Sequence, residues 1–168
     1  MITSISRTEF LLKSIVIIIA VLMPFICFYS EGYMKSISSY WTTDMQPLFI
    51  ISNCATAYYL LSFKNWRPSG TLLILLTAFS VEYYPVTHTS IAIFFFIITI
   101  YPLYMANRFR FCFYFYCLAL PALLINMFIA EVIGVTALCT FHFLSLLESY
   151  KINRKRNIIK DNITHKLD

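Results

Sequence analysis

Residues 111–147 read FCFYFYCLALPALLINMFIAEVIGVTALCTFHFLSLL, and this stretch decides how many times the chain crosses a bilayer. It carries one formal charge, Glu131, and its best turn residue is Asn126. A helix needs about 20 apolar residues to cross the hydrocarbon, with a lower limit near 17. The stretch therefore accommodates either two short crossings with a tight hairpin or one long, bent segment. We expect two crossings, Phe111 to Ile125 and Met127 to Leu147, of which the shorter would thin the bilayer locally.

Four further apolar stretches precede this one along the chain. Apolar residues make up 60% of the sequence and charged residues only 12%, about half of their share in soluble domains. Lipid must therefore cover much of the apolar surface, and backbone amides in lipid have to bond within a helix. The predicted crossings are Leu12 to Tyr29, Asp44 or Met45 to Phe63, Ser69 to Tyr84 and His88 to Ala106.

The basic residues occupy every second gap between these crossings. Of the 13 Lys and Arg residues, all except Lys35 lie at the N-terminal end, in the second or fourth gap, or in the tail: Arg7, Lys13, Lys64, Arg67, Arg108, Arg110 and those from Lys151 onward. Cytoplasmic loops are enriched in Lys and Arg, and an even number of crossings produces this alternation. The sequence therefore predicts an all-α, polytopic integral membrane protein with six transmembrane helices and both ends in the cytoplasm, in a bacterial inner membrane.

This topology divides the chain into two regions. Residues 1–150 form the six-helix transmembrane domain, and residues 151–168 form a basic cytoplasmic tail that continues the last helix for a turn or two. The formal net charge of +5 comes mainly from the tail and suits an anionic cytoplasmic leaflet. The tail contains no folded nucleic-acid-reading module, so membrane lipids, and not nucleic acid, are the expected partners.

The acidic residues gather at the opposite, outer side, together with one histidine. An ionisable residue at membrane depth is costly and is a candidate functional site by default. Asp44, His88 and Glu131 are the catalytic candidates, and these three with Glu82 are candidate metal ligands, because carboxylates and imidazole suit zinc or a similar ion. The simpler interpretation is that headgroups and water solvate the charges. In that case Asp44 would offset the positive end of the second helix.

Glu131 stands apart because it lies in a long uncharged stretch next to a minimal hairpin. We expect it to be partly buried and paired, either with His88 or with the loop around Ser38 to Trp41. The lone His142, near the end of the last crossing, is expected to hydrogen-bond a neighbouring helix.

The loop between the first two crossings contains the string S-I-S-S-Y at residues 36–40, which Trp41 and then Asp44 follow. It resembles a segment of uncharacterised bacterial multi-pass membrane proteins, in which S-I-S-x-Y precedes an aspartate that opens a helix. The resemblance implies a membrane location and lends no activity. In physical terms, Tyr40 and Trp41 suit the membrane–water interface as aromatic anchors.

Sequence motifs for catalysis or cofactor binding are sparse. The three glycines form neither a phosphate-cradling loop nor a G-x-x-x-G contact, and the five cysteines lack metal-type spacing. We therefore expect no cofactor. The sole triad that the chain could build combines Ser38 or Ser39 with His88 and with Asp44 or Glu131, because a serine nucleophile needs a base within hydrogen-bond reach.

Three functions fit this pattern, and the first is preferred. The protein would be a small non-enzymatic inner-membrane protein that binds another membrane component or itself, as accessory, immunity and superinfection-exclusion proteins do. The alternative is an intramembrane hydrolase or transferase that acts on a lipid through an outer-leaflet Asp/Glu/His site. The second alternative is a small oligomeric cation carrier or channel in which Glu131 and Glu82 line the path.

Overall fold

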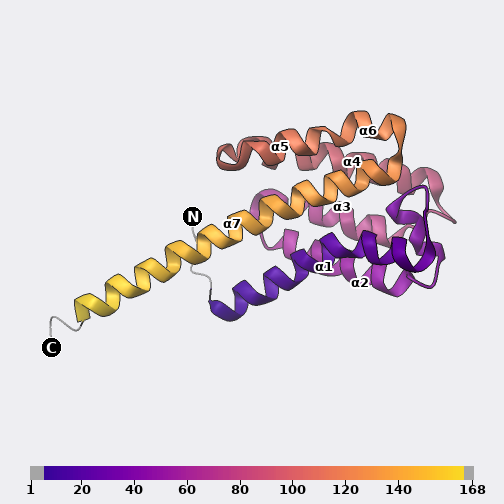
Figure 1. Cartoon of the computed structure of the whole chain (residues 1–168). Helices are drawn as coiled ribbons and strands as arrows, with labels where there is room; N and C mark the ends of the chain where they lie inside the picture. Colours follow the sequence, from indigo (N-terminus) through magenta and orange to yellow (C-terminus); the bar gives the residue numbers. More distant parts are fainter. Residues whose placement is uncertain (1–5, 165–168) are drawn as a thin grey trace.

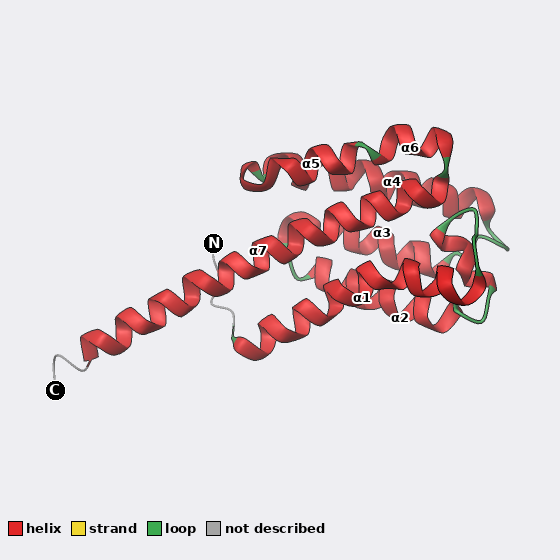
Figure 2. Ribbon diagram, in the orientation of Figure 1, coloured by secondary structure: helices red, strands yellow, loops and turns green. Residues whose placement is uncertain are grey.

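Helices make up nearly all of the chain, and the part that the structure describes contains no strand (Figure 2). The computed structural model describes residues 6–164, apart from the side chains of Asn107 and of residues 158–164. The all-α prediction is confirmed. The α-helices are α1 (Arg7–Glu31), α2 (Gln46–Leu61), α3 (Arg67–Ala78), α4 (Pro85–Met105), α5 (Arg110–Cys117), α6 (Ala119–Ile125) and α7 (Met127–Thr164); the short 3-10 helices are η1 (Ile37–Thr42), η2 (Lys64–Trp66) and η3 (Asn107–Phe109).

The helices form an antiparallel bundle that closes on itself. Successive legs α1, α2, α3, α4, α5–α6 and α7 run in alternating directions, and the described chain begins and ends toward the same side (Figure 1). Each leg packs against the next, and α7 closes the ring by packing against α1 on one side and against α5 and α6 on the other. The basic turns around η2 and η3 therefore lie at the end where α1 begins, and η1 lies at the opposite end.

Three helices are long and apolar enough to cross a membrane: α1, α4 and the Met127–Asn157 part of α7. The others are shorter than predicted. The helix expected over 69–84 ends already at Ala78, because Ser80 Oγ accepts the Glu82 amide at 3.1 Å and directs the chain into a turn. Pro85 then lies in the first turn of α4, where its missing amide costs nothing.

The leg predicted over 111–125 is broken into α5 and α6 at Leu118. Pro121 explains the break, because it has no amide to donate to the carbonyl of Cys117 and its ring clashes with that carbonyl. Asn126 forms the predicted hairpin, and its Oδ1 caps α7 by accepting the Ile129 amide at 3.1 Å. Residues 111–147 therefore form two antiparallel legs, and the alternative of one bent segment is wrong.

The C-terminal part of α7 differs from the prediction of a short extension. The helix runs on to Thr164 and projects beyond the bundle (Figure 1), whereas a turn or two past Leu147 was expected. Two contacts hold its base: Phe10 stacks on Tyr150 with ring centroids 4.5 Å apart, and Arg108 forms an ion pair with Glu148. Residues 165–168 of the predicted tail lie outside the described part of the chain.

Close packing between α2, α3 and α4 depends on small residues. A Cβ added to Gly70 would lie 2.9 Å from the carbonyl oxygen of Ala57 and 3.0 Å from Leu61 Cγ, so only glycine allows α2 and α3 to approach this closely. Next to it, the fully buried Thr99 donates to Ser69 Oγ at 3.1 Å and links α4 to α3. These contacts place α2, α3 and α4 around a common interior cavity.

Candidate functional site: a buried carboxylate at the outer end

Glu131 lies in the second turn of α7, where its side chain is 8% exposed. Its Oε2 accepts the backbone amide of Ile37, the first residue of η1. The amides at the start of a helix lack partners within the helix, so a carboxylate at this point satisfies one of them. The expectation that Glu131 is buried and paired is confirmed. The partner is Ile37 of the predicted loop around Ser38 to Trp41, and not His88.

Hydrogen bonds within the loop order the segment that Glu131 holds. Ser36 Oγ accepts the Ser39 amide at 3.2 Å and pairs with the hydroxyls of Ser38 and Ser39 at 3.0 and 2.8 Å. Tyr40 is fully buried and donates to the Gly32 carbonyl at 2.7 Å, so its prediction as an anchor at the membrane–water interface is wrong. Burial raises the pKa of Tyr40, which keeps its hydroxyl a donor.

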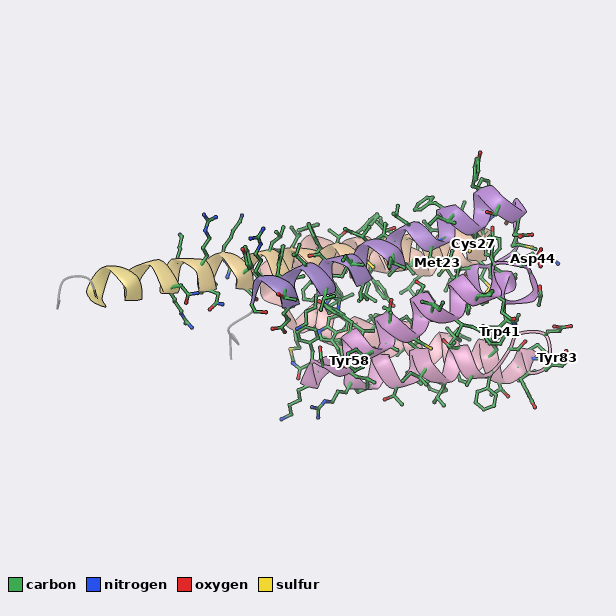
Figure 3. The ribbon with its side chains drawn as sticks, turned by 90° about the horizontal axis from the view of Figure 1, so that it is seen from below. Met23, Cys27, Trp41, Asp44, Tyr58 and Tyr83 are labelled. Carbon is green, nitrogen blue, oxygen red and sulfur yellow. The ribbon has the colours of Figure 1, made fainter. Side chains whose placement is uncertain are left out.

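The ordered loop closes a small second core at this end of the bundle. Tyr40 and Ile37 pack with apolar residues of α1 and α2 that Figure 3 partly labels: Met23, Cys27 and Phe49. Glu131 and the loop over residues 32–45 thus form one unit, which we call the outer cap. Asp44 lies at the surface of the outer cap and precedes α2, so it does not open that helix as predicted.

A cavity of about 90 Å³ lies beside Glu131 inside the ring of helices. Helices α1, α2, α3, α4 and α7 and the start of η1 contribute to its walls, which are mostly apolar. The polar groups on its walls are Ser38, Ser52, Asn53, Thr56 and Glu131. Since one water needs roughly 10–15 Å³ of such space, the cavity has room for a few waters or a small cation and is far too small for a lipid chain.

His88 is buried near this end but belongs to a different contact. Its Nδ1 lies 2.6 Å from the carbonyl oxygen of Phe79, so Nδ1 carries the proton and donates to it. This bond fastens the turn between α3 and α4. His88 does not line the cavity beside Glu131.

The four predicted metal ligands are not brought together. Asp44 and Glu82 are exposed, whereas His88 and Glu131 are buried in separate contacts. Among the residues that the structure describes, no group of three His, Cys, Asp or Glu side chains could hold a metal ion. The predicted triad also lacks its geometry, since Ser38 and Ser39 bond to Ser36 and His88 bonds to Phe79.

At the opposite, basic end the structure contains a second buried polar group, His142, for which the sequence predicted only a hydrogen bond to a neighbouring helix. His142 of α7 is 5% exposed, and its Nδ1 lies 3.3 Å from the hydroxyl of Tyr59 on α2. The predicted bond to a neighbouring helix is confirmed. The rings of Phe63, Trp66 and Phe141 also contact the imidazole. The chain gives no local motif for this cluster, because its members come from two distant stretches, residues 59–66 and 141–142.

Comparison with family models, curated proteins and solved structures finds no match for this chain, so its fold and sites are interpreted from their own chemistry.

Proposed function

We propose that this chain is a six-pass membrane protein with both ends and the basic turns on the cytoplasmic side of a bacterial inner membrane. Three helices are long enough to span on their own, and the alternating directions of all the legs support three further, shorter crossings. At about 1.5 Å per residue the 12 residues of α3 extend about 18 Å. Local thinning of the bilayer, together with the flanking turns, accommodates such a length.

Within that topology, we propose that the protein acts without catalysis by binding another membrane component at its outer surface. The observation that carries this proposal is the bond from Ile37 to Glu131. The one formal charge of residues 111–147 is bonded to a backbone amide of the outer cap, which supports a structural role for it. The hydrolase or transferase alternative needs Asp44, His88 and Glu131 to meet around one substrate, and these residues do not line a common cavity.

The surface at the outer end indicates the chemistry of the partner. It exposes aromatic rings and carboxylates from the end of α1, the α1–α2 loop and the α3–α4 turn: Tyr29, Glu31, Tyr33, Asp44, Glu82, Tyr83 and Tyr84. Lys35 is the one basic residue of this surface. Tyrosines with carboxylates attract Lys and Arg side chains through ion pairs and cation–π contacts. The proposed partner is therefore a membrane protein with basic residues at the outer interface, as accessory, immunity or superinfection-exclusion functions would require.

A photo-crosslinking amino acid at Tyr83 tests this proposal, with Tyr58 as the matched control. Both tyrosines are highly exposed, at 74% and 80%, but Figure 3 places Tyr83 at the outer end and Tyr58 toward the other end of α2. We expect the Tyr83 probe to capture one discrete protein and the Tyr58 probe to capture lipid. Capture from position 83 should be lost in the variant with Asp44→Lys and Glu82→Lys. Capture that survives both charge reversals would exclude the proposed surface.

A cation carrier is the second candidate, because the cavity beside Glu131 also exposes Ser52, Asn53 and Thr56 to its interior. Purified protein in liposomes should then conduct a monovalent cation, and Glu131→Gln should change the selectivity or abolish the flux. Liposomes that stay as tight as protein-free ones would exclude this function.

A further inference from the structure

The carboxylate of Glu131 is buried without an opposite charge beside it. The residue is 8% exposed, and no Lys, Arg or His is among the described residues that line the adjoining cavity. The Ile37 amide satisfies one carboxylate oxygen, Oε2, but an amide carries only a partial positive charge. Buried carboxylates are paired, coordinate a metal ion or take up a proton, because an isolated charge away from water costs too much free energy. The second oxygen, Oε1, therefore needs a cation or a proton.

Glu131 Oε1 borders the cavity and is not enclosed by protein. Within the described part of the chain, only the Nε2 atoms of His88 and His142 are both fully enclosed and without a hydrogen bond. Glu131 Oε1 also makes no hydrogen bond there, so it retains accessible surface, and the cavity is the space that Glu131 lines. The same holds for the side-chain amide of Asn53 and for the hydroxyl of Ser52, although Ser52 is only 2% exposed. Three polar groups without partners thus border one cavity.

Two further hydroxyls add oxygen atoms to the same walls. Ser38 pairs with Ser36 Oγ at 3.0 Å, and Thr56 donates to the Ser52 carbonyl at 2.8 Å. A hydroxyl oxygen that takes part in one hydrogen bond still has a lone pair for another contact. Carboxylate, hydroxyl and amide oxygens are the ligands that hard cations prefer. The cavity therefore offers oxygen ligands on two sides, from α7 and from α2 with η1.

The charge and the size of this site select the ion. One carboxylate supplies a single negative charge, whereas Ca²⁺ sites usually assemble several carboxylates and Mg²⁺ keeps several of its waters. The cavity of about 90 Å³ has room for one ion and a few waters, at roughly 10–15 Å³ for each water. We propose that the cavity binds one alkali cation, Na⁺ or K⁺. Glu131 Oε1 is the charged ligand, and the oxygens of Ser52 and Asn53 are neutral ligands.

A bound ion would give the two oxygens of Glu131 separate roles. Oε2 holds the Ile37 amide of the outer cap, and Oε1 holds the ion. The site lies in the cavity named for the cation-carrier candidate but goes beyond it, because an ion can be bound without being transported. It also requires no partner at the outer surface, so loss of the Tyr83 crosslink would leave it standing.

Binding is measured on the full chain in nanodiscs, which have no sealed compartment and therefore report binding without flux. Radioactive sodium, and radioactive rubidium as a substitute for K⁺, are titrated in separate arms, with choline chloride to hold the ionic strength constant. We expect saturable binding of at least one of the two ions, with one ion bound per chain.

Substitutions separate the proposed ligands from general attraction of cations to the protein and lipid. Glu131→Gln keeps an acceptor for Ile37 but removes the charge, and it should weaken binding about 10- to 100-fold, the effect of losing a contact to a charged group. Ser52→Ala removes one neutral ligand and should weaken binding about 3- to 10-fold. Ser62→Ala is the matched control, because the Ser62 hydroxyl bonds to the Tyr59 carbonyl and does not line the cavity. It should bind like the wild type.

Thermal unfolding in the same nanodiscs gives a second readout. A ligand that binds only the folded chain stabilises it, so replacing choline with the bound ion should raise the unfolding temperature of the wild type and not that of Glu131→Gln. If Glu131→Gln does not fold, the Ser52→Ala and Ser62→Ala pair decides.

The proposal has clear contrary outcomes. A protonated Glu131 would give no saturable binding of either ion, and this result would overturn the proposal. Equal binding by Glu131→Gln and the wild type, or by Ser52→Ala and Ser62→Ala, would overturn it as well. Saturable binding in nanodiscs together with ion-tight liposomes would support a resident ion and exclude only the carrier.

Discussion

The side chain of Glu131 and the backbone amide of Ile37 are hydrogen-bonded although 94 positions separate them in the sequence. This bond joins the start of α7 to the loop that connects α1 with α2. Helix α1 also packs beside α7 in the ring. An uncompensated buried carboxylate is expensive, and an amide at the start of a helix needs an acceptor. The outer cap therefore depends on the acceptor oxygen at position 131 more than on the charge there.

Two substitutions at Glu131 separate the acceptor from the charge. Glu131→Gln retains an acceptor oxygen for Ile37 and should leave the outer cap folded. Glu131→Leu removes it and should lower the free energy of unfolding by about 1–3 kcal/mol. Denaturation in mixed micelles and proteolysis of residues 33–45 measure the two effects. If the Gln variant were as destabilised as the Leu variant, the charge itself, and not the hydrogen bond, would be holding the loop.

Gly70 and Gly134 form a matched pair that tests helix packing. An added Cβ at Gly70 meets the Ala57 carbonyl at 2.9 Å, and backbone cannot move aside cheaply. We expect Gly70→Ala to destabilise the bundle by about 1–3 kcal/mol. At Gly134 the same Cβ meets the ring edge of the partly exposed Phe96, which can shift, and alanine favours a helix by up to about 1 kcal/mol over glycine.

Gly134→Ala should therefore change stability little. Thermal unfolding in detergent, followed by circular dichroism, compares the two variants. Equal losses would mean that α2 and α3 are not as closely packed as the structure has them.

The hydroxyl of Thr99 should contribute a measurable interhelical bond. It donates to the fully buried Ser69, and hydrogen bonds between helices in membranes average about 0.6 kcal/mol and reach about 1.7. Thr99→Val should cost stability in this range. Ser90→Ala is the control, because its exposed hydroxyl bonds only to the Val86 carbonyl of its own helix. A control loss as large as the Thr99→Val loss would contradict the interhelical role.

Local chemistry made much of this fold predictable from sequence. The lengths of the apolar stretches predicted the helical legs of the bundle. Asn126 predicted the hairpin, because its side chain can cap the next helix. The break at Leu118 was missed, although Pro121 prescribes it by removing a donor four residues beyond Cys117. The end of α3 at Ala78 was missed because a single serine bond at Ser80 decides it.

The sites were less predictable than the helices, since they depend on contacts between distant segments. The burial of Glu131 could be predicted from its uncharged surroundings. Its partner could not, because it is a backbone amide and nearly every residue type has one. Tyr40 was expected at the interface and is buried, because its hydroxyl reaches the Gly32 carbonyl. The cluster around His142 needs α7 to pack against Tyr59 and Trp66, which lie more than 70 positions earlier, and no sequence spacing predicts this contact.

The six-pass topology makes a prediction about accessibility that thiol labelling checks. The background is Cys54→Ser, which removes the exposed native thiol. Position 83 lies in the turn between α3 and α4, and position 64 lies in η2 between α2 and α3, so Tyr83→Cys and Lys64→Cys place single thiols at opposite ends of the bundle. A membrane-impermeant maleimide should label position 83 in intact cells and position 64 only after permeabilisation, because the basic turns face the cytoplasm. A reporter fused after Asp168 should be cytoplasmic as well. A reporter on the same side as position 83 would require an odd number of crossings, and the short legs α2, α3 and α5–α6 could then not all span the bilayer.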